Sequence, residues 1–141
     1  MNSTLAAAYG GRPGLPPAPR KHIAIVGAGA SGLCMAKYLL EIGADVTVFE
    51  MGTKIGGLWC YDNDNGASSI YRTLHINTAR NLTRFHDFDF KPGVQMFPSH
   101  EDMYQYLVDY ANHFGVTPRI LFKSKVTDVR PRFRVGIDEP R

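Results

Sequence analysis

The chain has 141 residues, enough for one small domain, and 44% of them are hydrophobic, which is sufficient for a core. Its net charge of +3 comes without a basic stripe interleaved with aromatic residues, so the composition argues against nucleic-acid binding. The two cysteines and five histidines lack the spacings of a metal site or a CxxC motif, and no apolar run is long enough for a transmembrane helix.

Residues 1–21 are rich in Ala, Gly and Pro, and such a segment cannot bury enough apolar surface to offset its ordering entropy. The segment also lacks the basic start and sustained apolar run of a signal peptide. We therefore expect a disordered N-terminal segment over 1–21, a folded part over 22–141, and a soluble cytoplasmic protein.

Next comes a stretch with the pattern of a nucleotide-binding unit. Residues 22–26 predict a strand, 30–42 a helix that ends at Gly43, and 45–49 a second strand. The turn between the first strand and the helix, Gly27–Gly32, has the spacing GxGxxG. This order is typical of a Rossmann-like βαβ dinucleotide-binding fold with a parallel α/β sheet.

Each glycine of the turn has a physical role in such a fold. Gly27 permits the tight turn, Gly29 lets a pyrophosphate approach the backbone, and Gly32 lets the helix pack close to the sheet. The helix amides then face the phosphate charge. Glu50 follows at about the 20-residue spacing at which an acid binds the ribose hydroxyls, although a solvated strand-end acid fits the position equally well. Met51, where an Arg would signal a 2′-phosphate, favours FAD or NAD over NADP.

The middle of the chain has weaker local signals. Residues 56–59, Gly-Gly-Leu-Trp, predict a loop with a paired glycine, beneath which Trp59 could simply pack. Residues 60–72 are polar and rich in turn formers, so we expect a surface loop. Residues 73–98 show no clean period and contain several phenylalanines, which indicates an irregular segment packed by aromatic side chains.

The last third predicts one helix and two short strands. Ser99 and Asp102 form the pattern of a capping box, and the apolar stripe that follows indicates a core-facing helix that stops at Gly115. Residues 120–122 and 126–129 are short strand-like segments.

Several of these motifs together resemble the flavin-containing monooxygenases, with their Baeyer–Villiger and N-hydroxylating relatives, over about residues 22–130. The motifs are Gly27–Gly32, Phe49–Glu50, Gly56–Trp59, Ile70–Arg72 leading to Asn77–Thr78, Asp87–Phe90 and Tyr106–Phe114. The glycine-turn motif is shared with many flavoproteins. The Gly-Gly-Leu-Trp loop after the acid is much more specific to this family.

The resemblance implies that this first dinucleotide fold binds FAD. It implies cofactor contacts for Gly27, Ala28, Gly29, Ala30, Ser31, Gly32, Glu50, Gly57, Leu58, Trp59, Asn77, Thr78 and Val126. In this arrangement the turn holds the pyrophosphate, Glu50 the ribose, and the Val126 backbone the adenine. Asn77 would be the catalytic residue beside the isoalloxazine, where a neutral amide donates and accepts hydrogen bonds without titrating. Without the resemblance, Asn77 reads as an ordinary turn or cap residue.

The implied reaction uses FAD, NADPH and O2: a C4a-hydroperoxyflavin oxygenates a soft nucleophile such as an amine or sulfide, or a ketone, and the cofactor carries the chemistry. The family continues into a second glycine-rich fold for NADPH, which these residues lack. Residues 22–141 then correspond to the N-terminal portion of an FAD-binding domain, with an incomplete doubly wound sheet. We expect the chain alone to be inactive, as a fragment, a truncated reading frame or half of a split enzyme whose companion polypeptide supplies the NADPH domain.

Two alternatives remain at this point. The first is a stand-alone FAD- or NAD-binding module without catalysis, which would bind its nucleotide tightly. The second is another flavoprotein with two dinucleotide folds. A disulfide reductase would need a CxxxxC motif after the glycine loop, where Cys60 stands alone, and an amine oxidase fits the Asn77 context less well.

Overall fold

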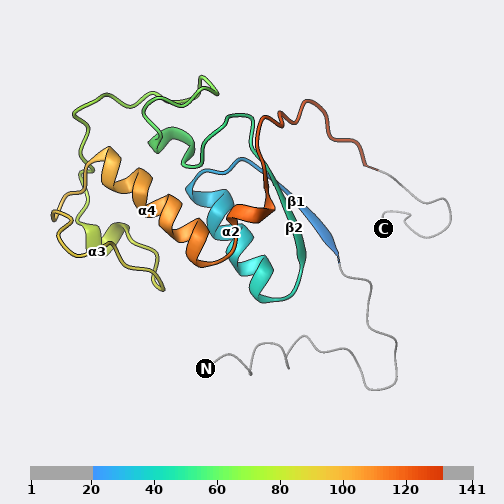
Figure 1. The fold of residues 1–141 in the computed structure, drawn as a ribbon, viewed down its shortest axis with the longest axis horizontal. Coiled ribbons are helices and arrows are strands. Elements are labelled where there is room, and N and C mark those ends of the chain that lie inside the picture. Colours follow the sequence, from blue (N-terminus) through green and yellow to red (C-terminus); the bar gives the residue numbers. More distant parts are fainter. Residues whose placement is uncertain (1–20, 132–141) are drawn as a thin grey trace, which may run out of the picture.

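The computed structural model describes residues 21–131 (Figure 1). The disorder expected over 1–21 therefore lies outside the described residues, apart from Lys21. None of the helices within 21–131 is both long and apolar enough to cross a membrane.

The described residues form a three-stranded parallel sheet with helices packed against it. In chain order the elements are β1 (His22–Val26), α2 (Ala30–Glu41), β2 (Asp45–Phe49), the 3-10 turn η1 (Gly57–Trp59), α3 (Arg80–Thr83), α4 (His100–His113), the 3-10 turn η2 (Thr117–Arg119) and β3 (Ile120–Leu121). The strand order is β1-β2-β3, with His22 opposite Asp45 and Val48 opposite Ile120. The predicted α/β class with an incomplete Rossmann-like sheet is confirmed.

Helix α2 of the βαβ unit ends just before Gly43, as the sequence predicts. Gly43 lies just after α2 with φ +79°, the left-handed conformation that glycine adopts without strain. Its N–H donates to the Leu40 carbonyl (3.0 Å), and the N–H of Ala44 donates to the Leu39 carbonyl (3.0 Å). These two bonds close the last turn of α2 and direct the chain into β2.

The core lies between one face of the sheet and two helices, α2 and α4. It joins fully buried side chains of Leu33 and Ala36 on α2, Val46 and Val48 on β2, and Leu107, Tyr110 and Ala111 on α4. The apolar stripe of the last helix is therefore core, as predicted. No helix in the described part of the chain covers the opposite face of the sheet, where Val26 is 66% exposed and Leu121 is 50% exposed.

The capping box of α4 is present in the structure. The N–H of Asp102 donates to Ser99 Oγ (3.1 Å), and the N–H of Ser99 donates to Asp102 Oδ2 (3.0 Å). At the other end of α4, Gly115 has φ +68° and the Val116 N–H donates to the Ala111 carbonyl (2.8 Å). The predicted start and stop of this helix are both confirmed.

The irregular segment 73–98 packs through its aromatic rings, as expected, and contains only the four-residue helix α3. The Phe90 ring stacks on Tyr106 with 4.2 Å between centroids, and Phe85 lies 4.5 Å from Tyr110. The Tyr106 hydroxyl accepts from the Phe85 N–H (2.7 Å) and donates to the Phe88 carbonyl (2.9 Å). Burial raises the pKa of Tyr106 to about 12, so the phenol stays protonated and keeps both bonds.

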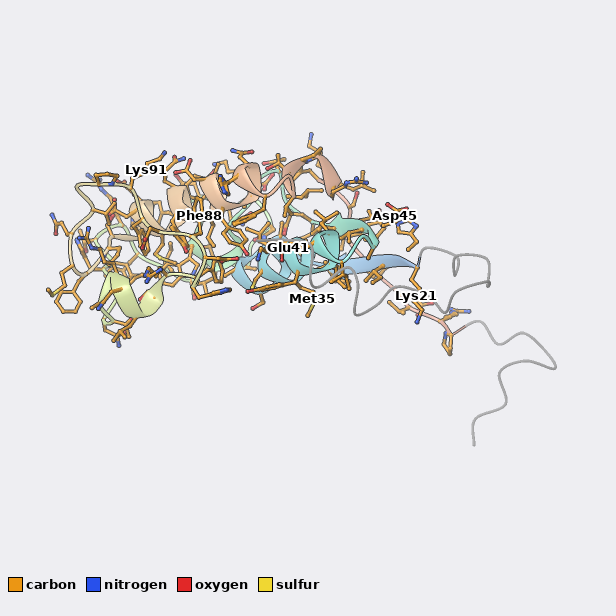
Figure 2. The ribbon with its side chains drawn as sticks, turned by 90° about the horizontal axis from the view of Figure 1, so that it is seen from below. Lys21, Met35, Glu41, Asp45, Phe88 and Lys91 are labelled. Carbon is orange, nitrogen blue, oxygen red and sulfur yellow. The ribbon has the colours of Figure 1, made fainter. Side chains whose placement is uncertain are left out.

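A partly buried ion pair, formed by a buried lysine, holds the same segment against α2. Lys37 is 3% exposed. Its ammonium binds Glu41 Oε1 (2.9 Å) on the same helix and the carboxylate of Asp87 in the irregular segment. The ammonium also lies 3.9 Å from the centroid of the Tyr38 ring. Figure 2 shows Lys91 and Phe88 on one side of Met35 and Glu41 of α2, and Asp45 and Lys21 on the other side.

The prediction of a strand over residues 126–129 is wrong, because the structure has no strand there. Lys123 has φ +54°, which turns the chain out of the sheet after the two residues of β3. The Ser124 N–H donates to the Glu50 carbonyl (2.8 Å), the last such backbone bond along the described chain, and Val129 is 79% exposed. Alternating apolar residues alone do not make a strand, because each strand needs a neighbour to bind its N–H and carbonyl groups.

Candidate cofactor site

The turn between β1 and α2 needs glycine at its first position because of its conformation. Gly27 has φ +96°, which side-chain-bearing residues rarely adopt, and its N–H donates to the Phe49 carbonyl (2.8 Å). A Cβ built at Gly27 would meet no atom of the described residues within 4 Å. Backbone conformation, rather than space, therefore selects glycine here.

The other two glycines of the turn differ from each other. A Cβ at Gly32 would lie 2.0 Å from the Gly27 carbonyl oxygen, so the close packing of α2 requires glycine there. A Cβ at Gly29 would meet only the Gly57 Cα, at an ordinary 3.7 Å, and φ at Gly29 is −81°. The folded chain itself does not require glycine at position 29. The predicted packing role of Gly32 is confirmed, and Gly29 leaves open space in front of the turn.

The N-terminus of α2 presents backbone donors to that space. The first bond of the helix runs from the Leu33 N–H to the Gly29 carbonyl (3.0 Å), so the N–H groups of Ala30, Ser31 and Gly32 precede it and have no partner within the helix. Among the described residues no side chain caps this end, and its first turn holds no acid. The helix dipole adds positive potential, so the end of α2 is suited to bind an anion.

A second glycine pair lies against the first turn. Gly56 and Gly57 have φ +111° and +54°, and the Gly56 N–H donates to the Ala28 carbonyl (3.0 Å). A Cβ at Gly57 would come within 3.1 Å of the Gly29 Cα. The two loops therefore meet backbone to backbone, which explains why the chain has paired glycines at this point.

Two pockets flank this contact, and Gly29 lines both. The first, about 260 Å³, lies at the end of β2 and includes Glu50, Asn65 and Val126 in its lining. The second, about 330 Å³, lies before the N-terminus of α2; its lining includes Leu58 and Trp59. Together they can take an elongated ligand whose middle crosses the glycine turn.

Glu50 is held in place by hydrogen bonds at the wall of the first pocket. It is 2% exposed, so the alternative of a solvated strand-end acid is wrong. Its Oε2 accepts from the Ala28 N–H (2.8 Å), and its Oε1 accepts from the Gly52 N–H (2.8 Å) and from Asn65 Nδ2 (3.3 Å). A carboxylate has about four acceptor positions, so these three bonds leave capacity for a ligand hydroxyl.

The remaining predicted residues fall into two groups. Leu58, half-buried Trp59 and half-buried Val126 line the pockets that flank the turn. Asn77 and Thr78 are exposed and line neither pocket, and Thr78 Oγ1 is bonded to Thr83 Oγ1 (2.7 Å). The structure thus brings the turn, Glu50, the 57–59 loop and Val126 together. Asn77 and Thr78 are not among the residues that line these pockets, and their cofactor roles stay predictions.

Sequence reasoning missed the turn 63–65 as part of the site. The loop 60–72 contains no helix or strand, but Asn63 within it is only 9% exposed and its Nδ2 donates to the Gly57 carbonyl (3.0 Å). A Cβ at Gly52 would lie 2.7 Å from Asn63 Oδ1, so this turn packs directly on the chain after Glu50. The run Asp62–Gly66 signals a turn, but nothing local reveals what the turn packs against.

Comparison with known proteins decides the family. Residues 20–136 match the model of the family described as "Flavin-binding monooxygenase-like". The chain belongs to this family. It is 35% identical to flavin-containing monooxygenase FMO GS-OX-like 5 of Arabidopsis thaliana, over 92% of this chain and 33% of the relative. It is 37% identical to human flavin-containing monooxygenase 1, over 77% of this chain and 21% of the relative.

A solved structure agrees with the sequence matches. The S-allyl-L-cysteine S-oxygenase of Allium sativum superposes with a TM-score of 0.68 at 32% identity, covering 74% of this chain and 28% of the oxygenase. The predicted resemblance to flavin monooxygenases is confirmed. The chain spans about a third or less of the length of the Arabidopsis and human relatives.

Proposed function

We propose that this flavin-binding monooxygenase-like chain is the FAD-binding part of an NADPH- and O2-dependent monooxygenase. The observation that carries the proposal is the position of Gly29. It lies between two pockets, with the uncapped N-terminus of α2 on one side and the carboxylate of Glu50 on the other. FAD has the matching order of groups, with an adenosine, a pyrophosphate and a flavin in a row.

The residues present fit this cofactor. The amides of Ala30 and Ser31 would bind the pyrophosphate, because they have no partner in their own helix. Glu50 would accept hydrogen bonds from the ribose hydroxyls, and the Val126 backbone would lie beside the adenine. Leu58 and Trp59 would line the flavin side. Bound FAD supplies the redox and oxygen chemistry, while the chain holds and orients it.

Asn77 is proposed to stand beside the flavin ring as a hydrogen-bonding amide. Its backbone is anchored on both sides, because the Ile76 N–H donates to the Pro98 carbonyl (2.8 Å) and the Arg80 N–H to the Met96 carbonyl (2.7 Å). The exposed side chain between these anchors is available to a ligand. Such an amide can donate and accept without changing charge over the working pH range.

We propose that the substrates are soft nucleophiles such as amines or sulfides, or ketones. Two similar proteins support the first two classes: one is a senecionine N-oxygenase of Tyria jacobaeae, and the other is the S-allyl-L-cysteine S-oxygenase of Allium sativum. NADPH binding would come from a part of the enzyme outside these residues, either on a longer chain or on a companion polypeptide. The uncovered sheet face, with Val26 and Leu121 exposed, is a surface against which such a part could pack.

The alternative is a stand-alone nucleotide-binding module without catalysis, which the glycine turn, the N-terminus of α2 and Glu50 would serve equally well. The two proposals differ in affinity. A module must hold its nucleotide by itself, whereas part of a larger FAD site binds only the adenosine half well and releases FAD readily.

The experiment is to mix the purified chain with FAD, record flavin binding at equilibrium, and then desalt. We expect binding at equilibrium that is lost on desalting, no reduction of the flavin by NADPH, and no binding by Gly29→Asp, which places a negative charge at the pyrophosphate position. Flavin retained through desalting would favour the module. Unchanged FAD binding by Gly29→Asp would refute the site.

A further inference from the structure

We infer that Asn65 positions the Glu50 carboxylate for the ribose, and that the turn 63–65 forms a wall of the first pocket, at the end of β2, where the adenosine would bind. The inference rests on the proposed function, because it assigns a role within the same nucleotide site. Asn65 lines the first pocket beside Glu50, and its Nδ2 donates to Glu50 Oε1 (3.3 Å). Among the described residues this is the one side-chain donor to that carboxylate.

The orientation of the Asn65 amide is fixed from its other end. Asn65 Oδ1 accepts from the Ala67 N–H (2.9 Å), an Asx turn that requires the oxygen on that side. The amide nitrogen must then point toward Glu50, which can only accept while it is ionised. Because the amide is neutral, it orients the carboxylate without cancelling the negative charge that attracts ribose hydroxyls.

The turn that carries Asn65 is anchored to both loops of the site. Asn63 Oδ1 accepts from the Asn65 N–H (3.1 Å), and Asn63 Nδ2 donates to the Gly57 carbonyl (3.0 Å). Asp64 Oδ1 accepts from the Thr53 N–H (2.8 Å). Asn65 therefore sits on a turn tied to the glycine loop on one side and to the chain after Glu50 on the other.

Close packing leaves this turn little freedom to shift. A Cβ at Gly52 would lie 2.7 Å from Asn63 Oδ1 and 2.8 Å from Asp64 Oδ1. The Gly52 N–H itself donates to Glu50 Oε1 (2.8 Å). The backbone donor and the Asn65 amide thus approach the same carboxylate oxygen, and Oε2 keeps its remaining acceptor capacity for a ligand.

Two substitutions remove the donor but keep the turn. Asn65→Ser retains an oxygen that can accept from the Ala67 N–H but is too short to reach Glu50, and Asn65→Asp retains the Asx turn but turns a carboxylate toward Glu50. Asn81→Ala is the matched control, because Asn81 is exposed on α3 and lines neither pocket of the site. Thermal unfolding of each variant checks that the fold is unchanged.

The probes are ADP and 2′,3′-dideoxy-ADP, titrated calorimetrically into the full chain. They carry the same charge and differ in the ribose hydroxyls alone. We expect Asn65→Ser to weaken ADP binding about fivefold to tenfold and Asn65→Asp to weaken it more, with dideoxy-ADP binding unchanged by Asn65→Ser. The control Asn81→Ala should bind both ligands as the wild type does.

Each other outcome overturns a defined statement. If the wild type prefers ADP to dideoxy-ADP but Asn65→Ser does not reduce that preference, the inference is wrong and the proposed function stands. Equal losses for both ligands would mean that Asn65 only supports the fold, which also overturns the inference. If the folded wild type binds neither nucleotide, the proposed function fails and the inference falls with it.

Discussion

Replacing Gly29 and Gly32 by alanine separates ligand binding from folding within one turn. A Cβ at Gly29 meets the Gly57 Cα at 3.7 Å, an ordinary contact, and the backbone there is extended at φ −81° and ψ −179°. A Cβ at Gly32 falls 2.0 Å from the Gly27 carbonyl oxygen. We expect Gly29→Ala to fold like the wild type. Its free energy of unfolding should fall by no more than about 1 kcal/mol, because alanine is a poorer N-cap than glycine.

The cost to binding follows from the space that the methyl group takes. At Gly29 it occupies the approach to the N–H groups of Ala30 and Ser31, so a pyrophosphate loses one charge-assisted hydrogen bond, worth about 1.5–3 kcal/mol. That loss corresponds to roughly tenfold to hundredfold weaker binding of FAD or ADP. Gly32→Ala must push α2 away from the turn and should destabilise the fold by about 1–3 kcal/mol or more.

The assay is chemical denaturation of both variants, followed by calorimetric titration of FAD into whichever variant remains folded. The predicted pattern is a stable Gly29→Ala with weak binding and an unstable Gly32→Ala. Wild-type FAD affinity in Gly29→Ala would refute the placement of the pyrophosphate. A Gly32→Ala variant as stable as the wild type would refute the reasoning about helix packing.

Three further substitutions test the fold around the site. Asp87→Asn should lower the free energy of unfolding by about 1–3 kcal/mol at neutral pH, because Lys37 loses a charged partner. Partial burial opposes ionisation of Asp87, but the Lys37 ammonium lowers the pKa of this carboxyl overall. The wild type should therefore lose the stability that the ion pair provides as the pH falls below about 4. Urea titrations at several pH values should show this loss for the wild type and not for Asp87→Asn. Tyr110→Phe should leave the melting temperature unchanged or raise it, because the buried Tyr110 hydroxyl has no hydrogen-bond partner in the described part of the chain. A decrease of more than about 1 kcal/mol in the free energy of unfolding would contradict this. Ser99→Ala should cost about 1 kcal/mol in the same urea assay, because it removes the side-chain acceptor for the Asp102 N–H, and an unchanged midpoint would count against the capping box.

The parts of the fold that the sequence predicts correctly are those with local causes. The βαβ unit follows from apolar periodicity and from the spacing of its glycines. The structure confirms the roles predicted for two of them, the turn at Gly27 and the close helix packing at Gly32. The start of α4 follows from Ser99 and Asp102, three residues apart. Each of these signals is contained within a few residues, so no knowledge of distant contacts is needed to interpret it.

The errors arise where the outcome depends on distant partners. Residues 126–129 alternate like a strand, but the last backbone hydrogen bond of this segment is that of the Ser124 N–H, so these four residues pair with no strand in the described part of the chain. Asn63 looks like a surface turn residue, but it is buried against Gly52 and Gly57, which the local pattern cannot reveal. Asn77 has no local signal of its own, so its proposed role depends on the family resemblance.

The most direct test of the central claim is a calorimetric comparison of FAD, ADP and FMN binding to the folded wild-type chain. The claim is that the turn after β1, the N-terminus of α2 and Glu50 bind the adenosine pyrophosphate half of the cofactor. The predicted result is that FAD and ADP bind with similar affinity and that FMN, which lacks that half, binds far more weakly. Binding of FMN as tight as that of FAD, or no binding of ADP by the folded chain, would contradict the claim.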